Sequence, residues 1–247
     1  MSNTHVCCPV VELRQYTLHP GMRDTLIELF DREFVESQEA TGMVVIGQFR
    51  DVNRPDRFVW LRGFSDMDAR AAQLQEFYGG PVWKAHRDAA NATMIDSDNV
   101  LLLRPAHPKC AFELTNAKRP PIGANEIPKG LVVATIYYLR ETAEPEFINF
   151  FERKLKPLLI DANVKVLGYF VTETSANTFP ALPVREDVNV FIWFACFADE
   201  AAYAEHKSAV GNSAHWQNQI AKELATSVKE GPEILRLSPT IRSRLRG

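Results

Sequence analysis

The chain has 247 residues, of which 46% are hydrophobic and 24% charged, a composition typical of a globular protein with a large core. Its formal net charge of -3 gives no global attraction to nucleic acid or to an anionic membrane, so we expect neither as a partner. No apolar run reaches the roughly 18 residues of a membrane span. The start, "MSNTHVCCPV", lacks the features of a signal peptide, which predicts a cytoplasmic protein.

Strands and helices alternate along the first half of the chain. Period-2 alternation predicts strands, apolar spacing of three and four predicts a helix, and Gly, Pro and Asn mark the breaks. The expected elements are a strand (10–18), a helix with the apolar face Leu26, Ile27, Phe30 and Phe34, a hairpin of two strands (43–50 and 57–64), a helix capped by Ser65 or Asp66, a second helical piece (about 82–94) and a strand (99–105).

The second half repeats this pattern. Tyr16 matches Tyr137 at an offset of 121 residues, and Trp60 matches Trp193 at an offset of 133. The second half therefore gains 12 residues between these landmarks. The gain falls in "TSANTFPALPVRED", which predicts a loop insertion near 174–187.

The order strand, helix, two strands, helix, strand is that of a ferredoxin-like unit. We predict a first repeat at 1–105, a linker at 106–129 and a second, diverged repeat at 130–247. A sheet with helices on one face leaves its other face bare, and two such sheets can cover each other. The predicted fold is α+β: two tandem ferredoxin-like repeats whose antiparallel sheets pack as an α/β barrel.

Two further features concern the cysteines and the end of the chain. No C-x-x-C motif is present, so neither a zinc ribbon nor a thioredoxin-type site is expected. Free thiols are expected in a reducing compartment, at Cys7, Cys8, Cys110 and Cys196. The tail "IRSRLRG" has three arginines in seven residues and is expected to be solvated.

The first half resembles the NIPSNAP family in "VELRQYTLHPG" and "FYGGPVWKAHR", whereas "SAVGNSAHW" in the second half keeps the Trp and lacks the Pro. The resemblance implies a member of the dimeric α/β-barrel superfamily. That superfamily includes haem enzymes, haem-degrading oxygenases, cofactor-free oxygenases, isomerases and proteins with no known reaction. Ligands of these relatives occupy an apolar cavity between the sheet and its helices, and self-association of the chain is expected.

One histidine is the main candidate ligand. His86 follows Trp83 by three residues, so both lie on one helical face. In haem-binding relatives the iron-ligating His sits on a helix that lines the cavity, and the resemblance implies haem held by His86, which is also the candidate metal ligand. The alternative is a core histidine bonded to backbone. His206 is a weaker candidate in the second half.

The other histidines are expected to face solvent. His5 lies in the N-terminal segment, His19 in a turn and His107 in the linker. His215 precedes Trp216, and adjacent helical residues point about 100° apart.

Strand residues of the first half are expected to line the cavity. Arg14 and Tyr16 share one face of their strand, as do Trp60 and Arg62 of theirs, and Phe77 approaches from a helix. A strand Arg among aromatics can pair with the carboxylate of a substrate or with a haem propionate. The alternatives are a rim ion pair for the arginines and plain core packing for the aromatics.

Two functions remain open. One is an oxidoreductase, an oxygenase-like enzyme that binds a small apolar or aromatic molecule in the sheet-helix cavity, with or without haem. The other is a non-catalytic ligand-binding or stress-response protein. The Gly-Gly-Pro break at 79–81 occurs only in the first half, which favours that half as the site.

Overall fold

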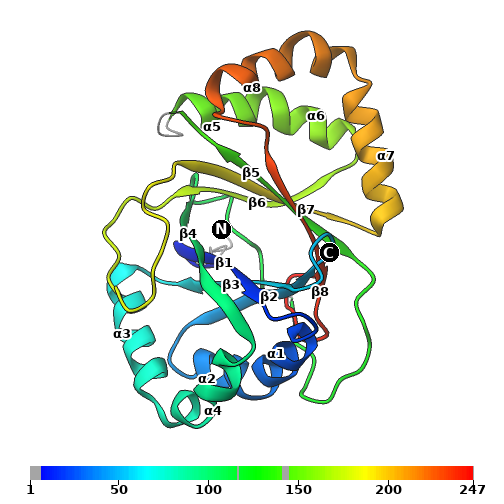
Figure 1. Ribbon diagram of the computed structural model, residues 1–247. Coiled ribbons are helices and arrows are strands. Elements are labelled where there is room, and N and C mark those ends of the chain that lie inside the picture. Colours follow the sequence, from blue (N-terminus) through cyan, green and yellow to red (C-terminus); the bar gives the residue numbers. More distant parts are fainter. Residues whose placement is uncertain (1–6, 116, 141–144, 247) are drawn as a thin grey trace.

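The computed structural model describes residues 7–115, 117–140 and 145–246, and its strands form one closed antiparallel barrel with helices outside (Figure 1). Within these residues there are eight strands: β1 (Val10–Leu18), β2 (Val44–Asp51), β3 (Arg57–Phe64), β4 (Met94–Pro105), β5 (Leu131–Tyr138), β6 (Lys165–Thr172), β7 (Val190–Phe197) and β8 (Glu233–Pro239). This confirms the expected mixed α/β architecture and the antiparallel barrel.

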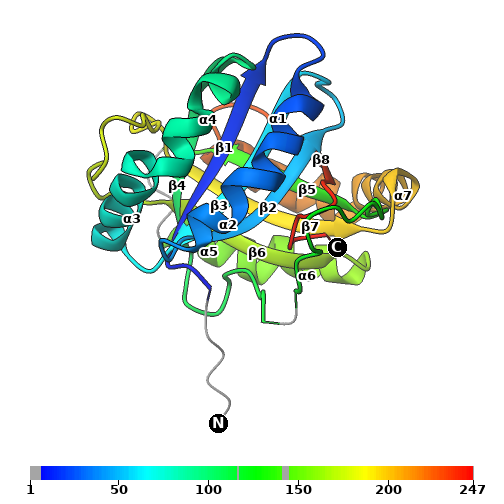
Figure 2. The same cartoon turned by 90° about the horizontal axis from the view of Figure 1, so that it is seen from below.

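Six helical segments of the described chain cover the outside of the barrel (Figure 1 and Figure 2). Three of them contain a π-helical turn, and the helix that follows Gly80 begins with Pro at its first position, where a missing N–H is tolerated. The segments are α1-η1-α2 (Arg23–Leu29, Phe30–Phe34, Val35–Glu39), α3 (Met67–Gly79), α4 (Pro81–Asn91), α5-η2-α6 (Glu146–Phe150, Phe151–Leu155, Lys156–Asp161), α7 (Glu200–Gly211) and η3-α8 (Trp216–Ile220, Ala221–Ser227). None of these helices is both long and apolar enough to cross a membrane.

The halves join at their edges as well as across the barrel. The strands run β4-β1-β3-β2 in the first half and β6-β7-β5-β8 in the second, and β2 pairs with β8 while β4 pairs with β6. An open sheet leaves unpaired N–H and C=O groups at both edges. Joining the halves therefore satisfies four edges at once, a contact that the sequence argument from bare faces did not anticipate.

The barrel interior is a single apolar core with side chains from both halves. Its largest members include Phe49, Phe112, Phe170 and Phe194. Gly47 and Gly168, a matched pair in the repeat, lie at irregularities in the β2–β3 and β6–β7 pairing. A Cβ at Gly47 would lie 2.6 Å from the Phe49 ring, and one at Gly168 would lie 2.9 Å from the Cys110 carbonyl oxygen. Close packing thus requires glycine at both positions.

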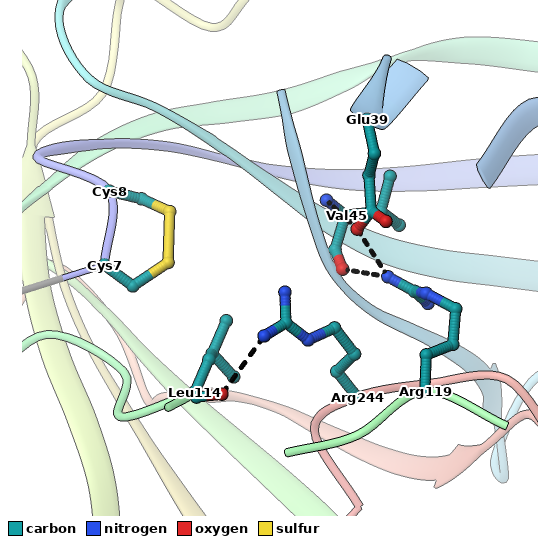
Figure 3. The surroundings of a disulfide bond; sticks show 7 residues. All are labelled: Cys7, Cys8, Glu39, Val45, Leu114, Arg119 and Arg244. Atoms are coloured by element: carbon teal, nitrogen blue, oxygen red, sulfur yellow. Dashed lines mark hydrogen bonds and ion pairs between the residues drawn. A yellow bond between two sulfur atoms is a disulfide. The ribbon is translucent and has the colours of Figure 1, made fainter. Parts of the chain in front are cut away.

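The C-terminal tail closes one end of the barrel, so the expectation of a solvated end was wrong. Thr240 and Ser243 are fully buried, and the Leu245 amide donates to the Ile46 carbonyl at 3.1 Å. Arg244 donates to the Leu114 carbonyl in the linker (Figure 3) and also to the Ala117 carbonyl. These hydrogen bonds fasten the C-terminal tail to the linker.

The expectation of free thiols holds for Cys110 and Cys196 and is wrong for the adjacent pair. Cys7 and Cys8 form a disulfide between neighbouring residues, close to the tail and the linker (Figure 3). Cys8 is buried against β3, and a Cβ on Gly63 would meet its Sγ at 2.4 Å.

The carboxyl group of Asp31 on η1 has a raised pKa. Its Oδ1 accepts from Gln48 Nε2 at 3.1 Å, and burial raises its pKa from 3.8 to about 6 although Arg242 and Arg119 oppose the shift. The folded state therefore holds this proton to higher pH than the unfolded chain. The resulting destabilisation is absent below pH 4, grows between pH 4 and 6, and stays constant above.

Asp31→Asn should accordingly raise the free energy of unfolding by about 2 kcal/mol at pH 7.5 and change it little at pH 4. The amide keeps an acceptor for Gln48 and removes the buried charge. Urea unfolding at both pH values measures this. Asp24→Asn, in a largely exposed pair with Arg50, is the control and should shift stability by less than about 0.5 kcal/mol. An equal effect of Asp31→Asn at both pH values would contradict this account.

Candidate functional site

A small cavity lies between the outer face of the first-half sheet and its helices. Its volume is about 30 Å³, room for one or two water molecules. Aromatic side chains dominate the walls, and Gln38 is the polar exception apart from two tyrosines. The lining residues are Tyr16, Leu26, Phe30, Phe34, Gln38, Trp60, Phe77, Tyr78, Trp83 and Met94.

The aromatic walls interlock at edges. The Phe30 ring lies 4.8 Å from that of Trp60, and the Trp83 ring lies 4.8 Å from Tyr78 and 5.5 Å from Phe34. The Phe30–Trp60 and Tyr78–Trp83 pairs are edge to face, and such pairs stabilise by about 0.5–1.5 kcal/mol beyond their buried area. The wall is therefore well ordered and offers flat apolar surfaces to a ligand.

A buried cluster of charged residues lies beside the cavity. Glu12 and Arg14 come from β1, Arg62 from β3 and Arg70 from α3, and each side chain is at most 1% exposed. One carboxylate bridges all three guanidinium groups: Glu12 Oε2 lies 2.8 Å from Arg14 Nη1 and 2.7 Å from Arg62 Nε, and Oε1 lies 2.7 Å from Arg70 Nε. In this way the cluster ties the sheet to a helix.

The local sequence explains why the four residues of the charged cluster lie together. Alternation on β1 places Glu12 and Arg14 on the outer face, and the β1–β3 register sets Glu12 opposite Arg62. Helix α3 begins at a true N-cap, where Asp66 Oδ1 accepts from the Ala69 amide at 2.7 Å. That cap fixes the first turn, from which Arg70 reaches the cluster.

The cluster carries an excess of positive charge. Burial opposes the ionisation of Glu12, but Arg62, Arg14 and Arg70 outweigh it and hold the pKa of Glu12 well below its usual value. Arg14 also donates to the Tyr16 hydroxyl at 3.0 Å, and burial raises the pKa of that phenol. One carboxylate thus faces three guanidinium groups that stay charged near neutral pH.

Two guanidinium nitrogens of the cluster are buried without a partner, Nη2 of Arg62 and Nη2 of Arg70. Arg62 reaches the cavity wall, because its Nη1 donates to Gln38 Oε1 at 3.1 Å and lies 3.5 Å from the Tyr78 hydroxyl. Buried donors of this kind are rare and call for an explanation.

A loop from the second half covers this first-half site. Residues 173–189, between β6 and β7, contain the predicted insertion and run beside α3 (the yellow loop of Figure 1). Arg70 Nη1 donates to Asn177 Oδ1 at 2.9 Å and to Thr178 Oγ1 at 3.3 Å. The Phe179 ring stacks on Tyr78, with ring centres 6.0 Å apart.

The second half has no charged residues at the positions that match the cluster. In the same register, Val133 stands opposite Ala195 where Glu12 stands opposite Arg62, and Thr135 stands opposite Trp193 where Arg14 stands opposite Trp60. Tyr203 lies four residues after the N-cap Asp199, as Arg70 lies four after Asp66. The positions of this half that match the charged cluster are therefore uncharged.

The structure brings most of the predicted cavity residues together. Tyr16, Trp60, Phe77 and Trp83 line the cavity, and Arg14 and Arg62 belong to the charged cluster beside it. Glu12 shares its strand face with Arg14 and was open to the same argument, but the sequence reasoning did not place it at the site. Other site residues that it did not identify are Leu26, Phe30, Phe34, Gln38, Arg70, Tyr78, Met94 and Phe179.

Neither His86 nor His206 lines the cavity, although the His86 ring lies 6.4 Å from that of the lining residue Phe34. His86 is one-third exposed on α4, and its Nε2 lies 3.5 Å from Glu33 Oε2 on η1. His206 belongs to the second half, where its ring lies 5.3 Å from Phe197 and burial lowers its pKa. A cavity of about 30 Å³ without a lining histidine does not fit a haem in this conformation.

The other histidines differ in how they compare with the expectation of solvent exposure. His19 and His215 are exposed as expected, and His5 lies outside the described residues. His107 was expected to be solvated, but its Nε2 lies 2.9 Å from Glu152 Oε1 and 3.1 Å from the Tyr169 hydroxyl. The linker is thereby fastened to the second half. Within the described chain, no three His, Cys, Asp or Glu side chains form a cluster suited to a metal ion.

Comparisons with known proteins agree with this fold. Residues 11–108 match the family model described as NIPSNAP, and no curated protein matches the chain. A candidate monooxygenase from Fusobacterium nucleatum is similar over 95% of this chain and 93% of its own, with a TM-score of 0.57 and 12% identity. A candidate monooxygenase from Lactobacillus acidophilus is similar over 95% of this chain and 97% of its own, with a TM-score of 0.58 and 12% identity. An anthrone oxidase-like protein is similar over 96% of this chain and 95% of its own, with a TM-score of 0.52 and 12% identity.

Replacing the carboxylate of the charged cluster tests its role in the fold. Glu12→Gln leaves three buried guanidinium groups without a counter-charge, so the free energy of unfolding should fall by about 3–5 kcal/mol at pH 7. Urea unfolding monitored by circular dichroism measures this. Glu200→Gln, in a half-exposed pair with Arg236, is the control and should change stability by less than about 1 kcal/mol. A loss below about 1 kcal/mol for Glu12→Gln would contradict the role assigned to this carboxylate.

Proposed function

Since residues 11–108 form a NIPSNAP domain, we propose that this chain binds a small apolar or aromatic molecule in the sheet-helix cavity of its first half. The observation that carries the proposal is the joining of an aromatic wall with a buried, positively charged cluster at one cavity. The packing of the second half supports it, because the matched positions there hold the uncharged residues Val133, Thr135, Ala195 and Tyr203. A fold that packs without these charges has no structural need of them in the other copy.

Binding requires the cavity to widen. About 30 Å³ is far below the roughly 300–1,000 Å³ of ordinary ligand pockets. Loop 173–189 is the element whose movement would widen it, since Phe179 covers Tyr78 and the loop meets Arg70 through neutral oxygens. The described structure is, on this proposal, the closed form.

Oxygenase chemistry is the first reaction to test, on account of the monooxygenase and anthrone oxidase likenesses in fold. A substrate with a methylene between aromatic rings can supply all the electrons: the CH₂ group and O₂ give C=O and H₂O. The cavity would contribute orientation, exclusion of water and hydrogen bonds from Tyr16 and Tyr78. Non-catalytic ligand binding is the second candidate, favoured by a lining that contains no His, Asp, Glu or Cys.

Binding can be followed with 2-naphthol and the tryptophan fluorescence of the full chain. We expect saturable quenching that is unchanged in Trp193→Phe, reduced in Trp60→Phe and largely lost when Trp60 and Trp83 are both replaced by Phe, because Trp60 and Trp83 line the cavity and Trp193, at the position matched to Trp60, does not. Quenching reduced equally in Trp193→Phe and Trp60→Phe would refute the assigned site. Oxygen uptake with anthrone then separates the two functions, since catalysis consumes one O₂ per anthraquinone formed and simple binding consumes none.

Haem binding can be tested directly by titrating hemin into the chain. We expect no saturable shift of the Soret band that depends on His86, because His86 faces Glu33 and does not line the cavity. His86→Ala is compared with His206→Ala and His215→Ala. A shifted band in the wild type that disappears only in His86→Ala would restore haem as the cofactor and His86 as its ligand.

A further inference from the structure

We propose that the ligand of this cavity carries a carboxylate that binds Arg62 and Arg70. Loop 173–189 is then a lid whose oxygens accept hydrogen bonds from Arg70 while no ligand is bound. This inference rests on the proposed function and names the chemical class of its ligand. Four observations support it: the charge balance, the two free guanidinium nitrogens, the groups that the loop offers to Arg70, and the contrast with the second half.

Charge balance is the first support. Three guanidinium groups share one carboxylate, and among the ion pairs of the described residues no other acid contacts them. Each buried, uncompensated cation is destabilising by several kcal/mol unless paired. An incoming monoanion would reduce the excess from two positive charges to one, whereas a neutral ligand would leave it unchanged.

The free donors are the second support. Arg62 Nη2 and Arg70 Nη2 are buried and unpartnered, while the Nε atoms of both residues bind Glu12. The two guanidinium groups are thus held in place by one shared carboxylate, with a free nitrogen on each. A carboxylate has two oxygens and can accept from both, a geometry for which guanidinium is better suited than ammonium.

The lid contacts are the third support. Asn177 Oδ1 and Thr178 Oγ1 accept from Arg70 Nη1, as the oxygens of a ligand would. Both are neutral and leave the charge of Arg70 uncompensated, whereas a carboxylate would accept the same hydrogen bonds and also supply a counter-charge. The loop has its own fastenings, since the Glu173 and Arg185 amides donate to the Leu102 and Val100 carbonyls of β4. A carboxylate can therefore replace the two lid oxygens without detaching the ends of the loop.

The two halves are the fourth support. The second half has no charged cluster at the matched positions and carries the inserted loop, whereas the first half has the cluster and no such loop. The inserted segment contacts the charged residues of the other half. This distribution is expected if one copy binds the anion and the other covers it.

The experiment compares 2-naphthoate with 2-naphthamide, which share a ring system and differ in charge, at pH 7.5 on the full-length chain. Affinities come from tryptophan fluorescence and from calorimetry. We expect naphthoate to bind at least tenfold more tightly than the amide. Arg70→Gln should reduce that preference to threefold or less while changing the affinity for the amide by less than threefold. Arg32→Gln, a largely exposed arginine on η1, should keep the preference.

The lid is tested with the double variant Asn177→Ala and Thr178→Val. Removal of the competing oxygens should strengthen naphthoate binding by about three- to tenfold, with a smaller change for the amide. Where Arg70→Gln is too unstable to assay, Arg70→Lys keeps the charge, loses the paired donors and should still reduce the preference. The thermal shift of the wild type by each compound gives the same comparison without a variant.

The outcomes separate the two claims. Equal affinity for naphthoate and the amide would overturn the carboxylate assignment and leave the apolar cavity in place. A preference that survives both Arg70→Gln and Arg62→Gln would also overturn it, since the anion would then bind elsewhere. Failure of 2-naphthol, naphthoate and the amide alike to bind would overturn the proposed function itself.

Discussion

The first half of this protein is organised around one carboxylate. Glu12 joins β1 to β3 through Arg62 and to α3 through Arg70, at distances of 2.7 Å in both cases. From Arg62 the contacts continue to Gln38 on α2, and from Arg70 to the loop of the second half. Sheet, two helical segments and lid therefore share one electrostatic centre, and a displacement of any of them changes the surroundings of the same buried charge.

The second half provides an internal comparison for this centre. It has the same order of elements and the same strand register, and it fills the corresponding positions with Val133, Thr135, Ala195 and Tyr203. Replacing a buried ion pair by well-packed apolar residues is often neutral or stabilising. The apolar version is thus available to this fold, and the charged version carries desolvation that the fold does not require. Retention of the charges is better explained by a ligand than by stability.

The sequence predicted the barrel and part of the site, and the limits have physical reasons. Alternation within strands placed Tyr16 and Trp60 at the cavity, because strand faces follow directly from residue number. Phe179 lies 119 residues from Trp60 and meets the site only through tertiary packing, which no local pattern encodes. His86 does share a helix with Trp83, but residues three apart differ by about 60° around the axis. That angle is enough for Trp83 to enter the cavity while His86 reaches Glu33.

Joining both halves in one chain changes what each half must supply. The edges β2–β8 and β4–β6 are closed by two different halves of one chain, so the two halves need not carry the same residues. On the proposal above, the first half supplies the site and the second half supplies a cover that reaches across the shared edge. The lid emerges from β6, which pairs with β4 of the first half, so its base lies next to the sheet that it covers. The edge-to-edge closure of the barrel is therefore what places the loop of one half over the arginines of the other.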